Sequence, residues 1–215
     1  MAKYNQLQTT QITSALKRAN QRIAQISKTY GRNSSVYKQE AGKFLKGAYQ
    51  PYISTSKSGN IKFDIRSINK LIRSQGDTSQ VQRMLADIAG IKFDKEGDIK
   101  EIKGGGVPTV SELTKRTEKK LERWGEDPGE YTKKELHKIT ETLAEFSENF
   151  QTAYNEYISK YGEAEARKDT TIQTLYGDFR NKRLTYRELE NIKARMEEMN
   201  AAARDEALQF EKDNT

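Results

Sequence analysis

The chain has 215 residues and a formal net charge of +7, with 38 Lys and Arg against 31 Asp and Glu. It contains no cysteine, which excludes disulfides, thiolate metal sites and cysteine nucleophiles, and its single histidine, His137, argues against zinc sites and Ser-His-Asp triads. Hydrophobic residues make up 34% and the mean hydropathy is −0.95, yet aromatic residues reach 9%. These values favour a folded, extended, mainly helical protein over a disordered one.

No segment resembles a targeting or membrane element. The N-terminal residues 1–11 lack an apolar core of signal-peptide length, and no run approaches the ~20 apolar residues of a membrane span. We therefore expect a cytoplasmic protein without membrane contacts.

Charge is distributed unevenly along the chain. Residues 1–73 carry 14 Lys and Arg against two acids, residues 74–110 carry five against six, and residues 111–215 carry 19 against 23. This segregation predicts a basic nucleic-acid-binding head over 1–73, a short helix, hairpin and Gly-rich linker over 74–110, and an acidic helical bundle or coiled-coil domain over 111–215. A solvated basic face is the alternative for the first segment.

The first predicted element is a helix over 11–31. Its apolar residues recur at steps of three and four, which places them on one narrow stripe, and Gly31 is a typical helix terminator. Four cations, Lys17, Arg18, Arg22 and Lys28, fall outside the stripe. The apolar residues are Ile12, Leu16, Ala19, Ile23, Ile26 and Tyr30.

A second helix is predicted from the Asn33–Ser35 cap to a stop at Pro51. After it, 52–55 and 61–65 have the pattern of two short strands around the polar loop 56–60, which predicts a β-hairpin.

Two short helices follow, from Arg66 to a break at Gly76 and from Asp77 or Thr78 to Gly90. Their Gly-containing connection at Gly76 resembles a helix-turn-helix, although helical hairpins are more often simple packing units.

A second hairpin is predicted from the strands 91–93 and 99–102. The acidic turn 94–98 resembles a calcium loop, but Gly97 is at the wrong position and Gly105 occupies the place of the closing Glu. A polar turn is therefore the better interpretation. The following Gly-rich stretch 103–108 lacks the Gly-Lys-Ser/Thr ending of a nucleotide-binding loop and is interpreted as a linker.

Beyond residue 108 the pattern is helical. Three threonines are each followed by Glu three residues later, which is the spacing of a capping box. The pattern predicts helices from Thr109 to about Trp124, from Thr132 to Gly162, and from Thr185 towards the C-terminus. The apolar stripes of the last two helices predict an antiparallel bundle or coiled-coil hairpin, within the protein or between copies. The predicted fold is thus mainly α and elongated, with one or two small β-hairpins and a long C-terminal helical hairpin or bundle.

No catalytic constellation emerges from the sequence. Acid pairs such as Glu163 and Glu165 are ordinary members of charged helix faces, and a partly exposed helical position is expected for His137. We expect neither an enzyme, nor a cofactor, nor a metal.

Nucleic-acid binding is better supported, because many cations neutralise phosphates without sequence choice. Five aromatic residues lie among them as possible base-stacking groups, although helical spacing favours core packing: Tyr30, Tyr37, Tyr49, Tyr52 and Phe63. Pairing of the first-helix cations with acids of 111–215 would contradict this prediction. The candidate nucleic-acid-binding residues are Lys17, Arg18, Arg22, Lys28, Arg32, Lys38, Lys43, Lys46, Arg66, Lys70 and Arg73.

Two stretches resemble a known family. The basic helix from Arg22-Ile23 to Lys28-Thr29-Tyr30-Gly31 is similar to the head of terminal proteins from small tailed bacteriophages, which replicate linear DNA by protein priming. The stretch from Arg116-Thr117-Glu118 through Asp127-Pro128-Gly129 to Lys134 resembles the helical region after the linker in that family. The order of basic head, linker and acidic helical domain agrees as well.

The resemblance implies DNA as the nucleic acid and a DNA polymerase as partner of the C-terminal helices. It also implies that a hydroxyl in the C-terminal helical domain receives the first nucleotide, for which Tyr176 is the first candidate and Thr174 and Thr185 follow. The location would then be the host cytoplasm or the virion. The alternative is a phage structural, scaffolding or host-inhibitor protein, of the anti-CRISPR type for example, whose long helices are oligomer or partner interfaces.

Overall fold

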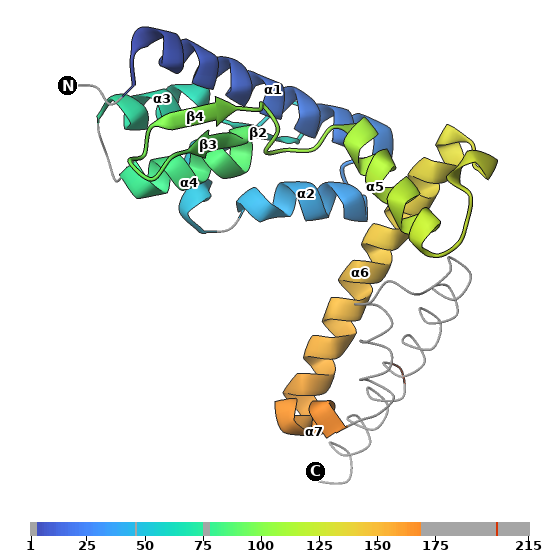
Figure 1. The fold of residues 1–215 in the computed structure, drawn as a ribbon. Helices are drawn as coiled ribbons and strands as arrows, with labels where there is room; N and C mark the ends of the chain where they lie inside the picture. The colour runs from blue at the N-terminus through green and yellow to red at the C-terminus, as the bar shows by residue number, and fades with distance from the viewer. Residues whose placement is uncertain (1–3, 46, 75–77, 169–200, 202–215) are drawn as a thin grey trace. The chain divides into compact units, whose positions relative to one another are not determined.

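The computed structural model describes residues 4–45, 47–74, 78–168 and 201. The protein is mainly α-helical with two small antiparallel β-hairpins, which confirms the predicted fold class (Figure 1). The chain divides into two compact units with the boundary between Leu113 and Thr114. The sequence placed divisions after residues 73 and 110, whereas contacts group residues 74–113 with the basic segment.

Helix α1 (Gln6–Tyr30) is the element on which the first unit is built. It begins before the predicted residue 11 because Asn5 and Gln8 form a capping box, in which Asn5 Oδ1 accepts from Gln8 N at 2.8 Å. Gly31 ends it, as predicted. Its buried stripe consists of Ile12, Ala15, Leu16, Ala19, Ile23 and Ile26.

Helix α2 (Ser35–Leu45) and the 3₁₀ helix η1 (Gly47–Tyr52) follow. The rings of Phe44 and Phe63 meet edge to face with centroids 5.1 Å apart, and Phe63 is fully buried. The buried Tyr37 hydroxyl accepts from Ile61 N at 2.9 Å. Aromatic residues of α2 thus join this helix to the first hairpin.

The first hairpin pairs β1 (Ile53–Thr55) with β2 (Ile61–Phe63). Asn20 of α1 docks it, because the Asn20 side chain accepts from Phe63 N at 2.7 Å and donates to Phe63 O at 3.1 Å. These two bonds satisfy the backbone N–H and C=O of Phe63, the last residue of β2, on the side where no further strand pairs with it.

Helix α3 (Ile65–Arg73) follows directly and is capped by Asp64, whose side chain accepts from Arg66 N and Ser67 N. Asn69 of α3 donates to Thr13 of α1 at 3.1 Å. Because Phe63, just before α3, meets Asn20 and Asn69 meets the earlier Thr13, α3 runs antiparallel to α1 (Figure 1). This register decides which side chains of the two helices are neighbours.

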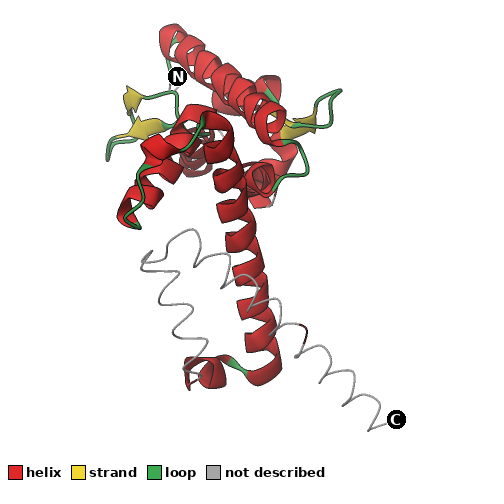
Figure 2. Cartoon of the chain, turned by 90° about the vertical axis from the view of Figure 1, so that its right-hand side faces the viewer, coloured by secondary structure: helices red, strands yellow, loops and turns green. Residues whose placement is uncertain are grey.

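Helix α4 (Thr78–Ala89) also packs on α1, and the second hairpin pairs β3 (Ile91–Phe93) with β4 (Ile99–Ile102). The two hairpins lie on opposite flanks of the first unit (Figure 2). Helices α3 and α4 bury apolar faces in the unit, with Ile68 and Ile72 from α3.

The Gly-rich stretch is packed into the first unit. A Cβ built on Gly106 would lie 2.2 Å from Asp87 O, and one on Gly90 would lie 2.7 Å from the backbone of Gly105. Val107 is buried at 1% exposure. The glycines therefore permit close backbone contact with the end of α4, and we call the stretch 103–108, which the sequence predicts as a linker, the Gly-rich strap.

The second unit is helical. Helix α5 (Val110–Arg123) begins in the first unit and continues across the boundary, and the 3₁₀ helix η2 (Pro128–Glu130), α6 (Lys133–Tyr161) and α7 (Glu163–Lys168) follow. The predicted capping boxes at Thr109 and Thr132 and the end of α6 at Gly162 are confirmed. The helix predicted to open at Thr185 lies outside the described residues. The buried apolar residues of this unit include Leu121, Leu136, Ile139, Leu143 and Ala144.

Among the helices that the structure describes, none combines the length and apolar character needed to cross a membrane. Within the same residues, no three His, Asp or Glu side chains are grouped in a way that would hold a metal ion.

Candidate nucleic-acid interface

Helix α3 presents a row of three cations. Arg66, Lys70 and Arg73 are exposed and are spaced four and three residues apart, so they lie on one face of the helix. The opposite face carries the buried Ile68 and Ile72. None of the three cations forms an ion pair within the described part of the chain. We call these residues the α3 row.

Two exposed lysines of α1 continue this positive surface. Lys17 lies one turn after Thr13, whose side chain contacts Asn69, so Lys17 is on the flank of α1 that faces α3. Lys28 follows eleven residues, or three turns, later and is on the same exposed side. The positive surface therefore extends along α1 away from the α3 row.

The turn after α1 and the first hairpin add three more cations. The Arg32 guanidinium lies directly over Gly59 in the hairpin loop, where a built Cβ would be 1.7 Å from Arg32 Nη1. Lys57 in the loop and Lys62 on β2 are exposed. Sequence reasoning did not select these two lysines, although the absence of acids from the hairpin sequence was a usable signal. The basic surface, as defined from here on, comprises Lys17, Lys28, Arg32, Lys57, Lys62, Arg66, Lys70 and Arg73.

The two acids of residues 1–73 both have local partners. Glu40 is buried at 7% exposure and pairs with Lys43. Asp64 caps α3, and the pKa of its carboxyl is lowered by hydrogen bonds from the Ser67 side chain and from the backbone of Ser67 and Arg66. The Glu40 charge is therefore balanced by Lys43, whereas Asp64 stays ionised and keeps one negative charge beside the α3 row.

The other described acids of the first unit belong to α4, the second hairpin and the start of α5. They are Asp87, Asp94, Glu96, Asp98, Glu101 and Glu112. The two hairpins thus differ in charge. The first hairpin contains lysines and no acids, whereas in and beside the second hairpin Lys92 and Lys103 each form an ion pair with Glu101, at 3.6 and 3.5 Å. The field of the first unit is therefore polarised between its two flanks.

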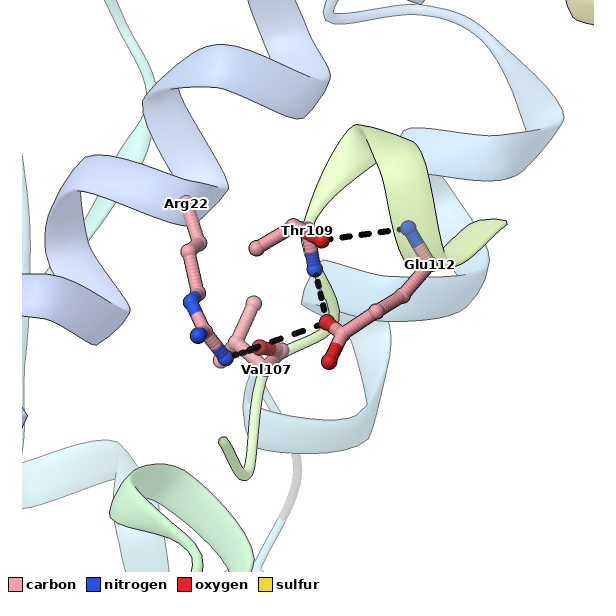
Figure 3. Close-up of polar contacts among 4 residues, drawn as sticks. All are labelled: Arg22, Val107, Thr109 and Glu112. Atoms are coloured by element: carbon pink, nitrogen blue, oxygen red, sulfur yellow. Dashed lines mark hydrogen bonds and ion pairs between the residues drawn. The ribbon is translucent and has the colours of Figure 1, made fainter. Parts of the chain in front are cut away.

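Arg22 lies on the flank of α1 that faces the Gly-rich strap (Figure 3). Its Nη1 donates to Val107 O at 2.7 Å and lies 3.9 Å from Glu112 Oε2, which also accepts from Thr109 N at 2.6 Å. The Arg22 side chain is only 18% exposed. Arg22 therefore connects α1 to the start of α5. Of the four candidate cations of α1, Arg22 has an acid partner from residues 111–215, namely Glu112.

Arg18, one turn earlier, also faces the strap, because a Cβ built on Gly104 would lie 2.9 Å from Arg18 Nε. Lys17, Arg18 and Lys28 form no ion pair with any residue that the structure describes. The remaining candidates are less uniform: Lys38 is exposed on α2, Lys43 pairs with Glu40, and Lys46 lies outside the described residues. The candidate priming hydroxyls of Tyr176, Thr174 and Thr185 also lie outside them.

The aromatic residues considered for base stacking have structural contacts. Phe63 and Tyr37 are buried, and Tyr49 packs on Phe44 and donates to Asp87. Burial and the Asp87 carboxylate raise the pKa of Tyr49 to about 12. Tyr30 and Tyr52 are half-buried. The chemistry of the basic surface is therefore that of charge, which recognises phosphates and not base edges.

Searches of protein-family models, curated proteins and solved structures found no match to this chain.

Proposed function

We propose that the protein binds DNA through the basic surface of its first unit, as a phage-type replication protein similar to terminal proteins. The observation that carries the proposal is the segregation of charge in three dimensions. Eight cations from α1, the turn after it, α3 and the first hairpin make up the basic surface, and the two acids of 1–73 are engaged in an ion pair and in helix capping.

Charge of one sign attracts the phosphate backbone, because each cation that meets a phosphate releases a condensed counterion. Such contacts give affinity without base choice. The proposed binding is thus strongly salt-dependent and weakly dependent on sequence.

The direct test measures the affinity of the full chain for a labelled duplex at fixed salt. Replacing the α3 row by R66Q, K70Q and R73Q removes three phosphate contacts, and we expect the affinity to fall by about 30- to 300-fold at ~0.1 M salt. An unchanged affinity would contradict the assignment of this surface.

A matched control removes the same charge from the opposite flank. Lys92, Lys95 and Lys100 of the second hairpin are exposed and lie among acids. We expect the K92Q, K95Q and K100Q variant to retain affinity within about threefold, since distant charges act only through a screened field. Equal losses in both triple variants would indicate attraction by net charge alone.

The replication role rests on the resemblance to terminal proteins. Incubation with a cognate DNA polymerase and labelled nucleotide should then place label covalently on the chain, and changing Tyr176, Thr174 and Thr185 singly should identify the acceptor. Label that survives all three changes would overturn the choice of site. Stable oligomers without DNA affinity would instead favour the structural or host-inhibitor role.

A further inference from the structure

We propose that the loop of the first hairpin, with Arg32 and Lys57, is a second phosphate-binding element, separate from the α3 row. Together the two elements would contact the DNA backbone close to one helical turn apart. This inference rests on the proposed function and adds to it a second contact element and a minimum duplex length.

The hairpin loop is held in one conformation. Ser56 N donates to Asn60 O at 2.7 Å, Asn60 N donates to Ser56 Oγ at 3.1 Å, and the two hydroxyls of Ser56 and Ser58 are 2.9 Å apart. A loop with internal hydrogen bonds of this kind loses little entropy when it meets a ligand.

The position of the loop is fixed at both ends of the hairpin. Its base is docked to α1 by the two bonds between Asn20 and Phe63, and the buried Tyr37 hydroxyl accepts from Ile61 N. The Arg32 guanidinium covers Gly59, whose φ of +79° and lack of Cβ permit this contact. Arg32 therefore adds its charge to that of Lys57 at the exposed end of a supported hairpin.

The distance between the two elements follows from α1. The α3 row flanks Asn69, which contacts Thr13, whereas the loop lies against Arg32. Helix α1 ends at Tyr30, seventeen residues after Thr13, so it spans roughly 26 Å between these positions, and Arg32 lies just beyond its end. One turn of duplex DNA is ~34 Å long, so a straight duplex along α1 would reach both elements.

Lys17, Lys28 and Lys62 are exposed between the two elements. They extend the positive potential along the flank, so the phosphates between the elements do not meet a neutral or acidic region. The described surface of α1 and β2 thus supports a continuous backbone path.

The test compares DNA hairpins with stems of about 5 and about 12 base pairs, which span roughly 17 and 41 Å. The variant R32Q/K57Q should lose about tenfold or more in affinity for the long stem and less than about twofold for the short one, because a short stem bound at the more cationic α3 row does not reach the loop. The α3-row variant should lose affinity for both stems.

Controls separate the possible failures. K57Q alone leaves Arg32 over Gly59 and should give part of the long-stem loss, and unchanged thermal unfolding of both variants excludes misfolding. Equal effects of R32Q/K57Q on both stems, or none on either, would overturn the second element while leaving the proposed function intact. Failure of the unaltered protein to bind any stem would instead refute the proposed function.

Discussion

Lys17 and Arg22 stand on the same helix but contact different surroundings. Lys17 is exposed on the flank facing α3, whereas Arg22 is 18% exposed, bonds to Val107 O and lies near Glu112. Proximity in sequence to other cations therefore does not give the two residues a common role. In the proposed function Lys17 therefore contacts the DNA, whereas Arg22 stabilises the fold.

The two assignments predict opposite phenotypes. Replacement of Arg22 by Gln should lower the free energy of unfolding by about 1–3 kcal/mol, because the part-buried hydrogen bond to Val107 O loses its charged donor. Lys17→Gln should leave stability within about 0.5 kcal/mol and lower DNA affinity several-fold. Denaturant unfolding and duplex titration of both variants check this, and a stable R22Q variant with greatly reduced affinity would reverse the assignment.

Asp64 offers a second test at the residue scale. Asn is as good an N-cap as Asp, so Asp64→Asn should preserve α3 while removing the acid that caps this helix. We expect DNA affinity to rise about two- to fivefold at low salt, because one negative charge beside the α3 row is lost. Asp64→Ala, the control, removes the charge and the cap together and should cost about 1 kcal/mol of stability. Loss of affinity in D64N would contradict the proposed surface.

At the scale of elements, the Gly-rich strap and α2 provide a matched pair of glycines. A Cβ at Gly106 would meet the backbone of Asp87 and Ile88 at 2.2–2.6 Å, whereas a Cβ at Gly42, within α2, would meet nothing within 4 Å. Gly106→Ala should therefore destabilise the protein by about 2–3 kcal/mol, and Gly42→Ala should stabilise it by about 0.5–1 kcal/mol. Thermal unfolding measures both, and a neutral G106A variant would show that the strap is loosely packed.

In the second unit, a buried hydroxyl pair joins α5 to α6. Thr140 Oγ1 donates to Leu136 O at 2.7 Å, so Thr117 Oγ1 is the donor in its 2.7 Å bond to Thr140. The single variants Thr117→Val and Thr140→Val should each destabilise, and the double variant should cost less than their sum by about 1 kcal/mol. Unfolding followed by fluorescence of Trp124, the chain's one tryptophan, measures this coupling, and additive effects would exclude it.

Local signals predicted the elements well. The capping pairs Thr109–Glu112 and Thr132–Glu135 and the terminator Gly31 fix helix ends through bonds between neighbours, and a sequence displays such bonds directly. The capping box of Asn5 and Gln8 was missed although its spacing fits the same signature, because the apolar stripe of α1 begins only at Ile12. The packing of the Gly-rich strap could not be predicted, because the sequence does not distinguish a glycine that gives the chain flexibility from one that permits close backbone packing.

The candidate site was predicted only in part, because charge reveals which residues are cationic but not where they point. Arg22 and Lys43 were selected for their charge, and the structure gives both of them acid partners. Lys57 and Lys62 join the basic surface only because Asn20 and Tyr37 hold the first hairpin against the rest of the first unit. Those contacts join residues more than 20 positions apart, and no periodic pattern encodes them.

At the scale of the whole molecule, the two units differ in charge. Residues 1–113 carry 19 Lys and Arg against nine Asp and Glu, whereas residues 114–215 carry 19 against 22. The unit that contains the basic surface therefore supplies all of the net positive charge. Its attraction for a polyanion weakens as salt screens it, and the slope of that weakening counts the phosphates that the protein neutralises.

The most direct test of the account is the salt dependence of duplex binding by the unaltered protein, the α3-row variant and the second-hairpin control. Neutralising the α3 row should reduce the slope of log K against log salt by about 2.7, the value for three lost contacts, while the control slope should change by less than ~0.5. Equal slopes for the unaltered protein and the α3-row variant would contradict the claim that this surface holds DNA.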